Sequence, residues 1–366
     1  MKKNITALLT IITIIIGCQT KKTDPNPSTP SSSLAVPTTF RIPIPSSLNG
    51  TPKTTSRMEN GRIEAADPAL SGNVIYEGLR GYIKLGDDAA SLVTSIMGFI
   101  KTYNLTTEMN VTFKDDKDNK FKTIIVVKNA KFENSIYEYR LLIRDSSLRL
   151  SAIEVFFNSA PIKGTAIISY NAVEPNNTVA GSNPMYRIDY DENPGGGAEK
   201  RMQIYISGVS STVGLTALRM NVTKTGDILD IVGNSNHPNV MAGDLALGTI
   251  NYAFRAKVNI ALNTGVAEIA LPLSSITTIN NTLMDTYSIK NVLKNAAVAK
   301  WGSANESLIN DYLKNANPPG FFDQTGFLYA GSAPSSVTGF NGLSTLTGLM
   351  PFVPNDIQTL NVQFSK

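Results

Sequence analysis

FKTIIVVKNAKFENSIYEYRLLIR, residues 121–144, decides the fold class of this chain. It contains two runs rich in Val, Ile, Tyr and Phe, Phe121 to Phe132 and Ile136 to Arg144, with a short polar link between them. β-Branched and aromatic side chains suit a pleated, half-buried surface, and a short link joins antiparallel neighbours. The stretch therefore predicts two antiparallel strands of a sheet.

Runs of the same kind occur on both sides of this stretch, with short polar or glycine-rich separators between them. They predict strands over residues 108–114, 148–157, 165–172, 185–190, 201–208, 217–222, 250–259 and 267–271. The polar segment 115–120 is the hairpin loop before the opening stretch. Strands joined in this way form a meander, and large sheets twist. We therefore expect a large, strongly curved antiparallel sheet.

Apolar residues recur at helical spacing in two other regions. One helix is predicted over 88–103, with Asp88 as its cap. The segment near 286–316 holds two more helices, and Ser303 with Glu306 forms a capping box before the second of them. The predicted fold class is α+β: a large curved antiparallel β-sheet, meander or half-barrel-like, packed with a few helices.

Two further segments complete the expected fold. Residues 321–327 form an aromatic loop that we expect to be tucked into the core beside the helices. Residues 357–364 alternate apolar and polar residues and predict a last strand. We find no internal repeat.

The N-terminus has the layout of a bacterial signal peptide. Lys2 and Lys3 precede an apolar run, Ile5 to Ile16, followed by Gly17 and Cys18, the only cysteine of the chain. The apolar run with Gly17 spans about 13 residues, and about 20 are needed to cross a bilayer as a helix. Residues 1–17 are therefore interpreted as a cleaved signal peptide. A free thiol at the start of a secreted chain would be reactive, which favours lipidation of Cys18 over plain secretion.

Residues 15–18, Ile-Ile-Gly-Cys, resemble the relaxed lipobox of spirochaetal lipoproteins. Gly17 and Cys18 match the usual pattern, whereas Ile15 and Ile16 depart from its Leu and its small residue. The resemblance covers about the first 18 to 20 residues, so it implies processing and acylation of Cys18, for example with palmitate, and no fold. Gln19 in place of Asp favours the outer membrane over retention in the inner membrane.

Residues 18–67 are predicted to be the lipidated cysteine and a disordered tether. The segment is rich in Pro, Ser and Thr, and it has too little apolar surface to fold by itself. It either reaches through a surface layer or is a spacer with no partner of its own, and we favour the spacer. The folded part is then a single α+β domain over residues 68–366, with its helical segment near 286–316.

Composition removes several classes of function. The formal charge of +4 falls to about +2 without Lys2 and Lys3, and so weak a charge provides no electrostatic footprint for nucleic acid. With Cys18 carrying lipid, the folded part has no disulfide and no Cys–His nucleophile pair. His237 is the single histidine, and because the stretch 233–239 is rich in turn residues, we expect it in a solvated loop.

Motifs for catalysis are also missing. We find no Gly-x-Ser-x-Gly elbow, no Walker-type phosphate loop and no dinucleotide fingerprint. We therefore predict no cofactor and no enzymatic activity. A hydrolase, the enzymatic alternative, would need a cleft with perturbed carboxylates around an acidic cluster.

The segment closest to a metal motif is Asp189-x-Asp191-x-Asn193, which is similar to the start of a calcium-binding loop. It departs from that pattern because Pro194 occupies the glycine position and Lys200 the position of the bidentate glutamate. The alternative interpretation is a polar hairpin tip. A second acidic cluster, Asp115, Asp116 and Asp118, is interleaved with three lysines that neutralise it.

The sequence therefore predicts a membrane-anchored surface or outer-membrane lipoprotein with a non-catalytic binding or structural role. Its expected partners are the lipid bilayer, through acylated Cys18, and a host or envelope protein. The alternative is a carrier of lipid or another hydrophobic ligand in the periplasm or outer envelope, since a helix followed by a long meander resembles bacterial lipoprotein carriers in topology. A carrier requires an open apolar pocket inside the sheet.

Overall fold

The computed structural model describes residues 37, 39–51, 58–59, 62–63, 72–102, 105, 107–115, 119–146, 150–178, 181–210, 215–242 and 245–365. The predicted signal peptide, Cys18 and most of the predicted tether lie outside these residues. The chain divides into two compact units. Unit 1 contains residues 37–41, 88–193 and 362–365, and unit 2 contains residues 42–87 and 194–361.

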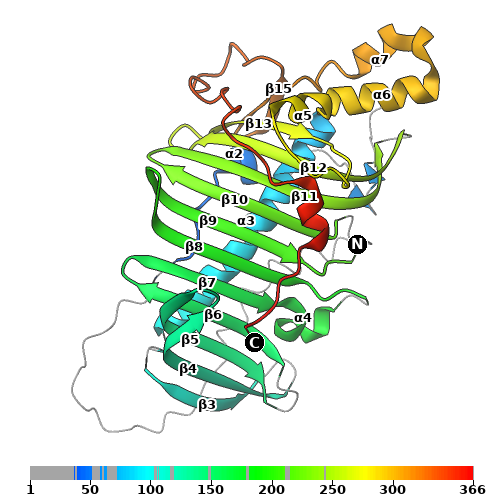
Figure 1. Cartoon of the computed structure of the whole chain (residues 1–366). Helices are drawn as coiled ribbons and strands as arrows, with labels where there is room; N and C mark the ends of the chain where they lie inside the picture. Colours follow the sequence, from blue (N-terminus) through cyan, green and yellow to red (C-terminus); the bar gives the residue numbers. More distant parts are fainter. Residues whose placement is uncertain are drawn as a thin grey trace. The chain divides into compact units, whose positions relative to one another are not determined.

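Unit 1 is built on the strands of the opening stretch and their neighbours in sequence, and each strand pairs antiparallel with the next (Figure 1). The short helices α4 (Tyr170–Val173) and η2 (Pro175–Asn177) lie between the last two of these strands in the chain. The strands are β3 (Met109–Lys114), β4 (Phe121–Phe132), β5 (Ser135–Asp145), β6 (Ser151–Ser159), β7 (Ile162–Ser169) and β8 (Met185–Gly195).

Unit 2 continues the same topology, and consecutive strands again pair antiparallel. Its strands are β9 (Ala198–Ser207), β10 (Ala217–Thr225), β11 (Ile228–Ala242), β12 (Leu245–Asn259), β13 (Thr264–Ala270), β14 (Gly320–Asp323) and β15 (Gly326–Ala330), with β1 (Met58–Glu59) and β2 (Arg62–Ile63) off this path. Its short helices are α2 (Ser46–Asn49), α5 (Asn281–Thr286), α6 (Ile289–Trp301), η4 (Ser303–Asn305), α7 (Glu306–Tyr312) and η5 (Pro354–Thr359).

The prediction of a large antiparallel meander is confirmed. The strand order is open, with β3 at one end and β15 at the other. Strands dominate over helices, so the fold is mostly β rather than an even α+β mixture. No helix among the described residues has both the length and the apolar character needed to cross a membrane.

The main helix is much longer than predicted. Helix α3 runs from Gly72 to Thr102, whereas the apolar spacing indicated a start at Asp88. The first half was missed because it is not amphipathic: residues 75–80 are all buried, and they include Glu77 and Arg80. A helix buried on all sides carries no stripe of alternating polarity for sequence analysis to detect.

The folded part also begins earlier than predicted. Phe40, Ile42, Ile44 and Leu48 lie in the predicted tether, yet each is at most 5% exposed. Phe40 stacks on Tyr190 in unit 1 with ring centroids 5.7 Å apart. The proline- and serine-rich composition of this segment concealed the few apolar residues that fold back onto the sheet, so residues 39–50 are not part of a disordered tether.

A strand was missed in the middle of unit 2. β11 (Ile228–Ala242) contains the stretch 233–239 that was interpreted as turns, and it pairs with β10 and β12. Hydrogen bonds to both neighbours outweigh the turn preference of Gly, Asn and Ser. Pro238 is accommodated because the register with β12 shifts between His237 and Val240, and a bulge tolerates a missing donor.

The last part of the chain differs from prediction in three places. Residues 320–330 form the hairpin β14–β15 rather than a loop, although Phe321 and Phe322 are buried as expected. The predicted capping box does not form: Ser303 begins the 3-10 helix η4, α7 starts at Glu306 with no side-chain cap from Asn305, and the Glu306 carboxylate pairs with Lys294. The predicted last strand is the 3-10 helix η5 followed by irregular backbone.

Candidate functional site

His237, expected in a solvated loop, is buried in β11 and only 2% exposed. Its Nε2 atom lies 2.7 Å from the hydroxyl oxygen of Ser235, which is fully buried. The two residues are two positions apart in a strand, so their side chains point to the same face. The pattern Ser-x-His within a strand was the only sequence signal for this pair, and it was hidden by the turn interpretation.

Two tyrosines enclose the histidine ring. Tyr82 of α3 and Tyr252 of β12 lie with their ring centroids 4.8 and 4.5 Å from that of His237. Burial raises the pKa of Tyr82 well above its ordinary value, and nearby Tyr252 raises it further. Burial also raises the pKa of Tyr252, partly offset by its hydrogen bond with Tyr82. Both phenols are therefore neutral in the folded protein at ordinary pH.

A serine hydroxyl beside a histidine nitrogen is the first component of a nucleophile–base pair. Such a pair must also reach a substrate, and Ser235 has no exposed surface while the His237 ring is enclosed by Tyr82 and Tyr252. These contacts join α3 to β11 and β12 within unit 2. The arrangement supports a packing role for the pair.

A buried ion pair holds the first half of α3. The Arg80 guanidinium donates to the Glu77 carboxylate at 2.9 Å and to the carbonyl oxygen of Ser46 at 2.7 Å. The other Glu77 oxygen accepts from the backbone N–H of Phe327 at 2.7 Å. Glu77 and Arg80 are each 2% exposed. The pair thus links three segments of unit 2 that are far apart in the sequence.

Two glycines lie so close to this ion pair that neither position has room for a side chain. A Cβ on Gly50 would lie 1.7 Å from an Arg80 nitrogen, and one on Gly326 would lie 2.5 Å from a Glu77 oxygen. Gly326 also has a φ of +116°, a conformation that side-chain-bearing residues rarely adopt. The ion pair is therefore enclosed by backbone, with no room for a ligand at these two positions.

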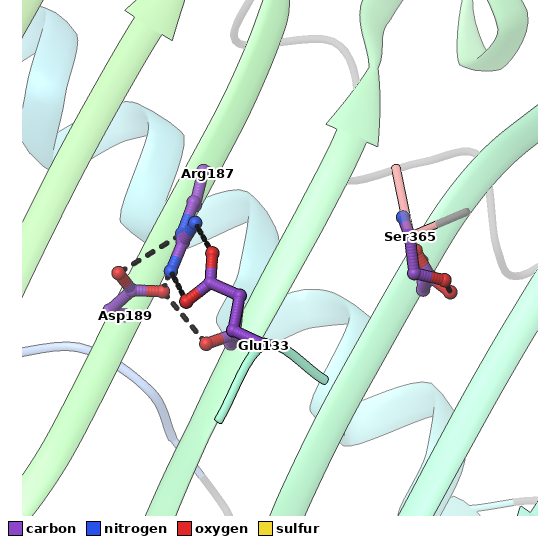
Figure 2. A network of polar contacts seen from close by, with 6 residues as sticks. Glu133, Arg187, Asp189 and Ser365 are labelled. Atoms are coloured by element: carbon purple, nitrogen blue, oxygen red, sulfur yellow. Dashed lines mark hydrogen bonds and ion pairs between the residues drawn. The ribbon is translucent and has the colours of Figure 1, made fainter. Parts of the chain in front are cut away.

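The residues of the predicted calcium loop lie on strand β8. The Asp189 carboxylate accepts from Arg187 at 2.9 Å and from the Thr165 hydroxyl at 2.8 Å (Figure 2). Asp191 pairs with Lys163 at 3.4 Å. Asn193 has a left-handed φ of +62° where β8 approaches the turn at Gly196 and Gly197.

These contacts oppose the metal interpretation because both carboxylates are already neutralised by cations. No group of three or more His, Cys, Asp and Glu side chains that could hold a metal ion occurs in the part of the chain that the structure describes. In the second acidic cluster, Asp115 pairs with Lys122 at 3.3 Å, while Asp116 and Asp118 lie outside the described residues.

Arg187 is the centre of the polar network in Figure 2. Burial lowers its pKa, but hydrogen bonds to Glu133 and the charge of Asp189 raise it by more, so the pKa lies above its ordinary value. The guanidinium also lies over the Phe132 ring, 5.3 Å from its centroid. One guanidinium thus contacts two carboxylates inside unit 1, and these contacts link β8 to Glu133 in the β4–β5 turn. Sequence reasoning missed Glu133 and Arg187 because they are 54 residues apart.

The second part of Figure 2 surrounds Ser365. Its hydroxyl and backbone N–H both donate to the fully buried Glu154 carboxylate, the latter at 2.8 Å. Arg140 donates to the same carboxylate at 2.7 Å. These contacts fix Ser365, the last described residue, on β6 within unit 1. Comparison with protein families, with curated proteins and with solved structures finds no match to this chain.

Proposed function

We propose that this chain is a lipid-anchored lipoprotein of the outer membrane or cell surface, and that its folded part is a non-catalytic binding or structural domain. The layout of residues 1–18 supports the anchor. One observation in the described residues supports the non-catalytic role: the hydrogen-bonded pair Ser235 and His237 is buried, and the His237 ring lies against Tyr82 and Tyr252. Acylation with more than one chain would hold the protein stably on a membrane.

We further propose that the part of the sheet in unit 2 is curved in a half-barrel-like manner around the first half of α3. Within unit 2, Tyr76 of α3 stacks on Phe327 of β15 with ring centroids 5.0 Å apart, while Gly86 faces Met220 of β10. A Cβ on Gly86 would lie 2.6 Å from the Met220 Cε atom. Within unit 2 the helix thus contacts β10, β11, β12, β14 and β15, and the burial of residues 75–80 on all sides supports curvature of these strands around it.

The same contacts weaken the carrier alternative. A carrier requires an open apolar cavity on the face of the sheet that α3 covers. Tyr76, Tyr82 and Gly86 already contact β14, β12 and β10 on that face. The side chains of α3 take the place that a hydrophobic ligand would need along this half of the helix, so we do not favour a carrier.

The anchor is tested by mass spectrometry of the mature N-terminus after expression in a diderm bacterium. We expect cleavage before Cys18, an acylated Cys18 and recovery in the membrane fraction. Cys18→Ala should leave the chain unacylated and release it from membranes. Gln19→Asp is the matched control: it should keep the acylation and move the protein toward the inner membrane. An unmodified Cys18 or cleavage at another residue contradicts the proposal.

Surface exposure is tested separately by protease treatment of intact cells. Degradation of the folded part in intact cells supports a surface role, and a pull-down from those cells can then identify an envelope or host protein. A domain that is protected in intact cells and cleaved only after lysis would rule out surface display, although the anchor itself would stand.

A further inference from the structure

Strand β3 (Met109–Lys114) has one free edge within the described part of the chain. It is the end strand of unit 1 and pairs only with β4 among the described strands (Figure 1). The pairing runs without a register shift from Met109 opposite Val126 to Lys114 opposite Phe121. The strand contains no proline, and it has no bulge against β4, so it lacks two of the devices by which end strands usually avoid pairing with other chains.

The residues of this edge separate by chemistry onto two faces. Side chains alternate along a strand, so Met109, Val111 and Phe113 share one face, and Glu108, Asn110, Thr112 and Lys114 share the other. The apolar face is incompletely covered, because Val111 is 51% exposed. A strand added to this edge would bury Val111 and extend both faces.

The segment 108–114 is complementary to itself when two copies run antiparallel. A two-fold axis normal to the sheet at Val111 keeps the faces of both copies aligned and places Val111 opposite Val111 of the second copy. The remaining pairs are Glu108 with Lys114, Met109 with Phe113, and Asn110 with Thr112. Directly opposite side chains are about 5 Å apart at Cβ and interact, so this register places unlike charges together at both ends and apolar residues together at the centre.

We propose that two copies of this chain associate through their β3 edges, with Val111 at the two-fold axis. The partner is a second copy because of the residue pattern: each of the seven positions meets a residue of matching chemistry in one register. Moving the axis to Thr112 would instead place Lys114 opposite Asn110 and lose the charge pairing. A slip of one residue between copies would place apolar residues opposite polar ones. The proposal does not depend on the lipid anchor.

A charge-exchange experiment tests the register. The full chain, purified in detergent, is examined by sedimentation equilibrium, and we expect a monomer–dimer equilibrium. Glu108→Lys or Lys114→Glu alone places like charges opposite each other twice and should raise the dissociation constant by about tenfold. The double variant Glu108→Lys with Lys114→Glu restores both pairs and should return the constant to about the original value. Both residues are exposed, so folding should be unaffected.

A second variant tests the centre of the interface. Val111→Lys places two ammonium groups together at the axis and should abolish the dimer, while Ile136→Lys makes the same change at a residue that is 71% exposed and outside β3. Circular dichroism checks that both variants are folded. The proposal is overturned by a wild-type chain that stays monomeric at all concentrations. A folded Val111→Lys variant that still dimerises, or a double charge variant no tighter than the singles, overturns it equally.

Discussion

The ion pair between Glu77 and Arg80 provides the sharpest test of how α3 is held. The pair is 2% exposed at each residue and also satisfies the Ser46 carbonyl and the Phe327 N–H. Glu77→Gln removes the negative charge and leaves the Arg80 guanidinium buried without a counterion. Arg80→Met removes the positive charge and leaves the Glu77 carboxylate buried without a counterion. Each single change should lower the free energy of unfolding by about 3–5 kcal/mol.

The double variant should be less destabilised than either single variant. Glu77→Gln with Arg80→Met leaves no buried charge, and the amide oxygen at residue 77 can still accept from the Phe327 N–H. The remaining loss is the donor to the Ser46 carbonyl at 2.7 Å, and an unsatisfied buried acceptor costs about 1–3 kcal/mol. The second substitution, made in the background of the first, should therefore raise the free energy of unfolding.

Urea unfolding measures these differences. Trp301 is the only tryptophan of the chain and belongs to unit 2, as the ion pair does. Its fluorescence therefore follows the relevant unit, and far-UV circular dichroism follows the whole chain. Additive costs in the double variant, or single variants that lose less than about 1 kcal/mol, would refute the view that Glu77 and Arg80 form a desolvated pair.

Four further measurements test other parts of the structure. Burial raises the pKa of Tyr76, Tyr82 and Tyr252 in unit 2. Above about pH 10 these tyrosines therefore lose their protons in the unfolded chain before they do so in the folded chain. Stability should be unaffected below that pH and should fall above it by about 1.4 kcal/mol per pH unit for each tyrosine. Tyr82→Phe should remove one such contribution from urea titrations between pH 9 and 11, and an unchanged slope would contradict the burial of the phenol. Gly233→Ala would place a Cβ 2.3 Å from the Phe254 ring and 2.8 Å from the Arg219 carbonyl oxygen, so thermal unfolding should show a loss of about 1–3 kcal/mol. Gly98→Ala in α3 meets nothing within 4 Å and should raise stability by up to about 1 kcal/mol; a loss instead would show that this helical position is crowded. Asn251→Ala removes the donor to the Pro354 carbonyl at 2.8 Å and should speed amide hydrogen exchange over residues 352–361, with no change expected in α6.

Local pattern was a good guide wherever burial alternates along a strand. The bounds of β4 were predicted to the residue, and those of β3 and β5 to within one. In these segments the side chains on one face contact the core and those on the other do not, so apolar and polar residues alternate in the sequence with the two-residue period of a strand. The same rule failed at β11, where Asn234, Ser235 and Asn236 are buried on both faces.

The candidate sites were predicted less well than the strands. His237 was placed in a solvated loop, yet it lies between Tyr82 and Tyr252, which precede and follow it by many residues in the chain. Asp189 was considered for calcium because of its spacing to Asp191, but its carboxylate instead contacts Arg187 on the same strand and Thr165 on the adjacent strand β7. Spacing along the chain identifies residues that share a face, but it does not identify the partner on the adjacent strand.

The sequence by itself determined most of the meander, because β-branched and aromatic runs with short separators favour pairing with their neighbours, and it determined the expectation of a lipid anchor at Cys18. Only the tertiary structure decided the length of α3, the burial of Phe40, Ile42, Ile44 and Leu48, and the position of β3 at the end of the described sheet. Each of these depends on which distant segments meet: Ser46 and Phe327 complete the Glu77–Arg80 site, and no described strand covers β3. Burial depends on which segments meet in the folded chain, so a polar or weakly periodic segment can be enclosed without any local signal in the sequence.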